Sequence, residues 1–258
     1  MPFVLVSAPV YDRAWILGDW FAAIENQDFP LKNIGFQFEA APNDDETINA
    51  LMDFYNEHPE VRCFDIVIND KEVHKAHPEG QRTWSRERYS VMANFRNNLL
   101  ARAICKAPDR LFSLDTDIIL EDTSTISTLY QMTGQLDAVS PLMFMTPTDI
   151  AFPNVMDWGV NGNGYRKNEY PYGSTFQAGV IMAGVMMSPQ VFNKAKYTYH
   201  RQGEDLGWAM ECKTYGLELY CASSIYAAHM MSRGMLARYK EKGDLRKELL
   251  EQKILQKV

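Results

Sequence analysis

The feature that most constrains the fold is an alternation of short apolar segments with longer amphipathic segments through the first 120 residues. The apolar segments have the length and composition of buried strands, whereas the segments between them carry apolar side chains at helical spacing. The expected strands are residues 3–7, 34–39, 61–68 and 110–120, and the expected helices are residues 15–26, 46–55 (with Asp45 as N-cap) and 89–106. Because strands joined through helices pair in parallel, the pattern predicts an α/β fold with a mostly parallel, Rossmann-like sheet and helices on both faces.

The second half of the chain is less regular. Residues 138–144, 180–187 and 217–221 have the character of strands, and residues 204–215 and 244–258 have the spacing of helices. Two polar stretches without a clear period, residues 69–88 and 146–175, are expected to be loops. The second of these is rich in Pro, Gly, Asn and aromatic residues, which suits a loop that faces substrate.

Two carboxylates stand near the end of the apolar segment 110–120. If this segment is one strand, Asp115 and Asp117 point to the same face, because side chains two residues apart share a face. Ligands of parallel sheets bind at the carboxyl ends of the strands, and paired carboxylates suit a divalent cation that accompanies a diphosphate. The segment therefore indicates an enzyme that uses a nucleotide sugar.

The composition argues against several classes of protein. No apolar run is long enough to span a membrane, and the first ten residues do not have the form of a signal peptide. The net charge of −7 argues against a protein that coats nucleic acid. Four scattered cysteines, without metal-binding spacing, are expected to be buried free thiols of a cytoplasmic protein.

Five motifs occur in an order that resembles the glycosyltransferases of family 2 and their relatives, which share the GT-A fold. The motifs are residues 21–30 with Gln27 and Phe29-Pro30, residues 95–103 with Arg96-Asn97, Asp115-Thr116-Asp117, Glu204-Asp205, and His229. The resemblance covers roughly residues 3–232. It implies a GT-A domain over residues 1–232, followed by a basic loop and an amphipathic helix over residues 233–258.

The resemblance also implies roles in catalysis. Asp117 would bind Mn²⁺ or Mg²⁺, His229 would complete the coordination, and Asp115 would contact the ribose or the metal with its bound water. An inverting transferase needs a base that takes the proton of the attacking hydroxyl. Asp205 is the expected base, and Glu204 is the alternative.

Further residues are implied in donor binding. The loop after the first strand contributes Pro9, Tyr11 for stacking on the base, and Arg13 for a phosphate. Arg96 is expected at the diphosphate or the base, and Gly179 at the floor of the sugar pocket. In the second strand the candidate is Glu39, at a place where the chain lacks the acid pair of many family members. After His229, Arg233 and Arg238 are expected in a loop that closes over the diphosphate.

Several alternatives stay open at this point. The acceptor is a glycan, a lipid-linked sugar, a protein or a hydroxymethylated base in DNA, the last supported by the basic tail and by Arg82, Arg86 and Arg88. The stereochemistry is inverting or retaining. A nucleotidyltransferase is disfavoured because residues 7–13 lack a Gly-rich phosphate loop, and a non-catalytic scaffold is the third class. For the terminal helix, three roles stay open: packing on its own domain, a homodimer contact, or binding to the surface of an anionic membrane.

Overall fold

The protein is described here by a computed structural model, which places residues 1–41, 46–69, 85–146, 149–167 and 170–243. Three expectations lie outside these residues, namely the capping role of Asp45, the position of Arg82 and the terminal helix over residues 244–258. The same holds for most of the expected loop over residues 69–88.

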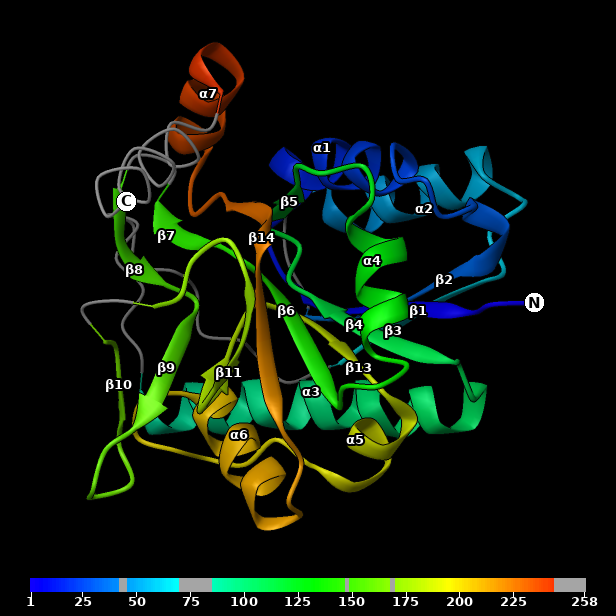
Figure 1. The fold of residues 1–258 in the computed structure, drawn as a ribbon. Helices are drawn as coiled ribbons and strands as arrows, with labels where there is room; N and C mark the ends of the chain where they lie inside the picture. Colours follow the sequence, from blue (N-terminus) through cyan, green and yellow to red (C-terminus); the bar gives the residue numbers. More distant parts are fainter. Residues whose placement is uncertain (42–45, 70–84, 147–148, 168–169, 244–258) are drawn as a thin grey trace.

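A mixed sheet forms the centre of the described part of the chain (Figure 1). Its strand order is β11-β14-β6-β13-β4-β1-β2-β3, and β5 pairs with β14 beyond the end of this order. The strands are β1 (Val4–Val10), β2 (Ile34–Ala40), β3 (Cys63–Ile68), β4 (Arg110–Leu114), β5 (Ile118–Leu120), β6 (Ala138–Leu142), β11 (Thr175–Ala178), β13 (Gly184–Met187) and β14 (Leu219–His229). The pairs β3–β2, β2–β1, β1–β4 and β6–β14 are parallel. The predicted α/β fold with a mostly parallel sheet is confirmed.

Helices cover both faces of this sheet, as predicted (Figure 1). On one face lie α1 (Ala14–Glu25), α2 (Thr47–Glu57) and α4 (Thr125–Met132), and on the other lie α3 (Arg86–Lys106), α5 (Pro189–Lys194) and α6 (Glu204–Thr214). A short 3₁₀ turn, η1 (Leu31–Asn33), precedes β2, and α7 (Arg233–Lys242) stands beyond the end of β14. Among the described residues, no helix is both long enough and apolar enough to cross a bilayer.

Aromatic side chains dominate the core on the α1 face. Trp20 and Phe21 of α1 pack on Phe36 and Phe38 of β2, and Phe21 stacks on Phe54 of α2 with ring centroids 3.7 Å apart. Fully buried aromatic rings contribute large apolar areas, so these contacts fix α1 and α2 on the sheet.

The segment 110–120 is not one strand. β4 ends at Leu114, residues 115–117 form a turn closed by a hydrogen bond from the Ile118 N–H to the Asp115 carbonyl, and β5 then pairs with β14. The predicted single strand is therefore wrong, and a turn, rather than strand alternation, sets the directions of the two carboxylates. The segment 180–187 is likewise divided, into β12 (Val180–Ile181) and β13. The break contains Ala183 at φ 68°, a conformation that non-glycine residues rarely adopt.

Four further expectations need correction. The stretch 146–175 is not a single loop, because it contains β8 (Asp149–Pro153), β9 (Val155–Trp158) and β10 (Gly164–Tyr165), and β8 pairs with β7 (Phe144–Thr146). Helix α3 begins at Arg86 because the Ser85 hydroxyl caps the Arg88 N–H, and residues 233–242 are helical rather than a loop. The cysteines are free, but Cys105 is exposed and Cys63 is only half-buried.

Helix α6 passes so close to a neighbouring loop that one position requires glycine. A Cβ on Gly207 would overlap the carbonyl group of Thr198, which is backbone and cannot move aside. We expect Gly207→Ala to lower the free energy of unfolding by about 1–3 kcal/mol, as overpacked cores do. Urea denaturation measures this.

The matched control is Gly18→Ala, in the exposed part of α1, where a Cβ meets no atom within 4 Å. This variant should gain roughly 0.5–1 kcal/mol because alanine favours the helix. Equal stability changes in the two variants would contradict the close packing described for α6.

Candidate active site

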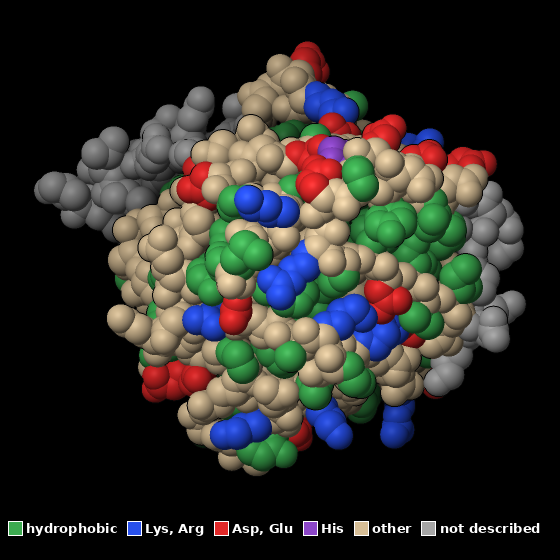
Figure 2. All heavy atoms as spheres, turned by 90° about the vertical axis from the view of Figure 1, so that its right-hand side faces the viewer, with side chains coloured by type: hydrophobic (Ala, Val, Ile, Leu, Met, Phe, Trp, Pro, Cys, Tyr) green, Lys and Arg blue, Asp and Glu red, His purple; other side chains and the backbone are tan. Residues whose placement is uncertain are grey.

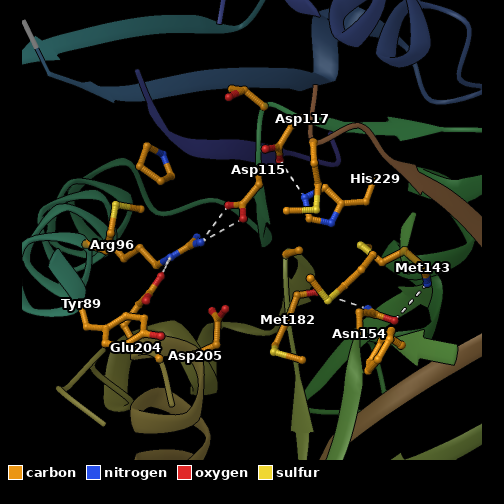
Figure 3. Close-up of a pocket in the computed structure, with 18 of the residues that line it drawn as sticks. Tyr89, Arg96, Asp115, Asp117, Met143, Asn154, Met182, Glu204, Asp205 and His229 are labelled. Carbon is orange, nitrogen blue, oxygen red and sulfur yellow. Dashed lines mark hydrogen bonds and ion pairs between the residues drawn. The ribbon is translucent and has the colours of Figure 1, made fainter. Parts of the chain in front are cut away.

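The carboxyl ends of β1, β4, β6 and β14 meet at a cavity of about 760 Å³ (Figure 3). Its walls come from the loop after β1, the turn between β4 and β5, the start of α6 and the β7–β8 hairpin. Crevices at this edge of an α/β sheet are the usual place for a ligand. The sequence predicts the ligand site at this same edge of the sheet.

Asp117 lies at the centre of a polar cluster in this cavity. One carboxylate oxygen, Oδ2, is 3.0 Å from Nη2 of Arg13, and the other, Oδ1, is 3.6 Å from Nε2 of His229 (Figure 3). The Met230 N–H donates to the Asp117 carbonyl at 2.8 Å, which holds the end of β14 beside the turn. Two segments 112 positions apart in the chain thus bring a carboxylate and an imidazole together.

The residues of this cluster fit a divalent cation. Ligand atoms that share one cation, each at about 2.1 Å from it, lie roughly 3–4 Å apart, as Asp117 Oδ1 and His229 Nε2 do. Carboxylate oxygen with imidazole nitrogen suits Mn²⁺ better than Mg²⁺. Within the described ranges no group of three or more His, Cys, Asp or Glu side chains could hold a metal alone. A cation here would therefore need further ligands from a diphosphate or from water.

Asp115 belongs to a second cluster, centred on Arg96 of α3 (Figure 3). Nη2 of Arg96 donates to both carboxylate oxygens of Asp115, at 2.9 and 3.1 Å, and Nε donates to Glu204 at 3.3 Å. Nη1 of Arg96 donates to the Ser113 hydroxyl at 3.3 Å, and only 4% of the arginine is exposed. The guanidinium is thus occupied by protein groups, which leaves little of it for the direct donor contact that the sequence indicated.

Asp205 is a half-buried carboxyl at the start of α6 that lines the cavity. Loss of water contacts raises its pKa to about 8, and the charges of Glu204 and Asp115 act in the same direction, whereas Arg96 opposes them. The pKa of the neighbouring Tyr197 hydroxyl is also raised, chiefly by burial. A carboxyl with a pKa near neutrality can take and give protons efficiently, as a general base requires.

The structure brings most, but not all, of the expected site residues together. The cavity lining includes Pro9, Tyr11, Arg13, Arg96, Asp115, Asp117, Glu204, Asp205 and His229. Three expected donor residues lie outside this lining, namely Glu39, Gly179 and Arg233.

Each of these three has a different setting. Glu39 is fully buried in β2 and accepts hydrogen bonds from Asn69, Asn98 and Arg102, so it holds α3 on the sheet. At Gly179, a Cβ would lie 3.0 Å from Cα of Asp157, so this glycine permits a close backbone approach. Arg233 is exposed in the first turn of α7, not in a loop over the cavity.

Sequence reasoning missed the apolar wall that faces the carboxylates. The lining of the cavity contains half of the fourteen methionines of the chain. They are Met92, Met143, Met145, Met156, Met182, Met231 and Met235. Asn154 braces the wall, since its Oδ1 accepts from the Met143 N–H (Figure 3). Its Nδ2 donates to the Ser140 hydroxyl and the Pro141 carbonyl. Only the composition of residues 146–175 indicated that this region faces substrate.

The fold and the cavity together have the form of a GT-A glycosyltransferase domain. The chain belongs to glycosyltransferase family 25, because the family model of its N-terminal domain matches residues 1–210. A curated relative, a glycosyltransferase 25 family member of Anopheles gambiae, is 18% identical over 250 residues. That alignment covers 90% of this chain but only 41% of the mosquito protein. The chain thus spans less than half the length of this relative.

Solved structures agree on the fold. The mannosyltransferase PcManGT of Pyrobaculum calidifontis, solved with GDP-Man and Mn²⁺, has a TM-score of 0.60 at 14% identity, covering 92% of this chain and 59% of that one. GalNAc-T7, solved with UDP, GalNAc and Mn²⁺, has a TM-score of 0.64 at 10% identity, covering 89% and 44%. TarS of S. aureus, residues 1–349 with UDP-GlcNAc, has a TM-score of 0.55 at 14% identity, covering 88% and 58%. The predicted glycosyltransferase fold is confirmed, with family 25 as the matching family.

Proposed function

We propose that this chain transfers a sugar from a nucleotide-sugar donor to a hydroxyl acceptor, with Mn²⁺ or Mg²⁺ bound by Asp117 and His229. The observation that carries the proposal is the placement of these two side chains beside Arg13, in the same cavity as the carboxyl of Asp205. Metal-binding and proton-accepting groups then face one space, as a displacement at a sugar carbon requires.

The residues around Asp117 are suited to a nucleoside diphosphate. A divalent cation bound there would neutralise the charge that develops on the leaving diphosphate. Arg13 follows β1 and lies next to the same carboxylate, so its guanidinium lies at the place where a phosphate would arrive. Similar folds have been solved with GDP-Man and Mn²⁺ and with UDP, GalNAc and Mn²⁺, which supports a donor of this class here.

Asp205 is the better candidate for the base of an inverting reaction. Glu204 is buried and holds the Nε–H of Arg96, which ties its carboxylate to α3. Asp205 is half-buried, lines the cavity and carries the raised pKa. Its task would be to accept the proton of the acceptor hydroxyl during attack on the anomeric carbon.

A thermal-shift panel tests the donor class. We expect one group among the UDP-, GDP-, CDP- and dTDP-sugars to raise the melting temperature, and to do so only with Mn²⁺ or Mg²⁺. Stabilisation by a donor without metal would overturn the metal dependence. No stabilisation by any donor would overturn the donor assignment and favour a scaffold.

The surface in Figure 2 bears on the DNA-base alternative. On this face the described Lys and Arg side chains are interspersed with acidic, apolar and neutral groups, and they form no continuous basic track. Binding along a duplex usually needs such a track. This face therefore adds no support for a DNA acceptor.

A further inference from the structure

Arg166, in the lining of the cavity, differs in its contacts from other arginines that line it. Arg166 follows β10 and is half-buried among residues that line the cavity. Its Nε–H donates to the carbonyl of Pro153 at 3.0 Å, and its guanidinium carbon lies 5.6 Å from the ring centroid of Phe152. Among the residues that the structure describes, no Asp or Glu forms an ion pair with it.

This absence separates Arg166 from two other arginines of the cavity. Arg13 is paired with Asp117, and Arg96 is paired with Asp115 and Glu204. Burial lowers the pKa of Arg166 below its ordinary value. A half-buried cation is costly unless an anion or several hydrogen-bond acceptors reach it, so an anionic ligand would be bound well here.

The surroundings of Arg166 indicate what else the ligand carries. Phe152 is 51% exposed although it lines the cavity, and Met145, on the paired strand β7, is 40% exposed. Large apolar side chains at the mouth of a cavity favour a ligand with an apolar or flat group beside its charge.

Arg166 lies on a different structural element from the residues proposed to bind the donor. The metal pair comes from the β4–β5 turn and the end of β14, and Arg13 comes from the loop after β1. Arg166 belongs instead to the β8–β10 arm and packs on β8. The proposed donor-binding residues and Arg166 thus line the same cavity from different elements.

We propose that Arg166 binds an anionic group, a phosphate or a carboxylate, of the acceptor, and that Phe152 and Met145 contact an apolar part of the same molecule. This inference rests on the proposed transferase function, because the cavity is shared with the donor. The guanidinium would bind the anion through its two terminal nitrogens, which have the geometry for two parallel hydrogen bonds.

The experiment uses phenyl phosphate and benzoate as probes, and benzyl alcohol as an uncharged probe of similar size. Ligand-observed NMR measures their dissociation constants with the donor site empty and again with it filled by nucleoside diphosphate and Mn²⁺. We expect an anionic probe to bind roughly 10- to 100-fold tighter than benzyl alcohol under both conditions. Phenyl phosphate and benzoate distinguish a phosphate from a carboxylate on the acceptor.

Variants assign the preference to the arginine. Arg166→Gln should bind all three probes about equally, whereas Arg166→Lys should keep part of the preference because it keeps the charge. The matched control is Arg201→Gln, since Arg201 is exposed, donates to Asn163 and lies outside the cavity lining. Melting temperatures show whether each variant is folded.

Three results would overturn the inference. They are equal binding of charged and uncharged probes by the unaltered protein, an unchanged preference in Arg166→Gln, and displacement of the anionic probe by nucleoside diphosphate. The last result would assign the anion to the donor site. A failure of the donor class itself appears separately, as the absence of any metal-dependent stabilisation by nucleotide sugars.

Discussion

Replacing Asp117 with asparagine is expected to abolish metal-dependent donor binding and to lower the transfer rate by at least about 100-fold. Asparagine keeps the size of the side chain but removes the negative charge that a cation requires. It leaves Arg13 and His229 without the carboxylate that lies 3.0 and 3.6 Å from them. Removing one group that stabilises the charge of a transition state typically costs 10²–10³ in rate. Calorimetric titration of nucleoside diphosphate, with and without Mn²⁺, measures the binding.

The control for this variant is Asp19→Asn. Asp19 also forms an ion pair, with Lys240 at 2.7 Å, but it lies on the outer side of α1, away from the cavity lining. Donor binding should be unchanged in the control. Mn²⁺-dependent binding that persists in Asp117→Asn would contradict the assigned role of this carboxylate.

Replacing Asp205 with asparagine is expected to lower the transfer rate by about 10²–10⁴-fold while donor binding stays intact. The amide cannot accept the proton of the acceptor hydroxyl, yet it fits the same space at the start of α6. Steady-state kinetics together with calorimetry separate the two effects. Glu211→Gln, in the same helix but outside the cavity lining, serves as the control. A loss of donor binding equal to the loss of rate would contradict a base role.

The raised pKa of Asp205 gives this assignment a pH signature. The base must be deprotonated, so the transfer rate of the unaltered protein should rise with pH and level off above about pH 8. The stability changes in the opposite sense. Between about pH 4 and 8 the folded protein holds a proton that the unfolded chain has released, so this carboxyl makes unfolding easier as pH rises through that window. In Asp205→Asn this part of the pH dependence of the melting temperature should be absent.

The first half of the fold could be predicted from the sequence because its signals are local. Helical spacing in α1 and α3 and the apolar runs of β1 and β2 each predict an element without reference to the rest of the chain. The start of α3 was predicted at residue 89 rather than 86, because the Ser85 cap lies at the edge of a polar stretch with no clear period.

The interruptions of strands were not predicted, because the apolar residues on both sides of each break outweigh the turn-favouring Asp and Gly residues at it. Residues 110–120 are apolar on both sides of the Asp115–Asp117 turn, and the division depends on β4 pairing with β1 while β5 pairs with β14. At Ala183 the chain adopts a positive φ without glycine or asparagine. Long-range pairing decided both positions.

The candidate site was predicted in outline, but the partners within it were not. Arg96 was expected at the donor because of its motif, whereas its actual partners lie 17, 19 and 108 positions away in the chain and fill its guanidinium. Glu39 was expected among the donor-binding residues, but Asn98 and Arg102 of α3 bind its carboxylate inside the protein. No spacing in the sequence reveals such contacts between α3, α6 and the sheet.

The most direct test of the account is the release of nucleoside diphosphate from nucleotide sugars by the purified protein, measured with Mn²⁺ and again with an excess of chelator. We predict release from one class of donor that stops on chelation and returns when Mn²⁺ is added back. Release that continues at the same rate with chelator would contradict the central claim that Asp117 and His229 hold a cation during sugar transfer.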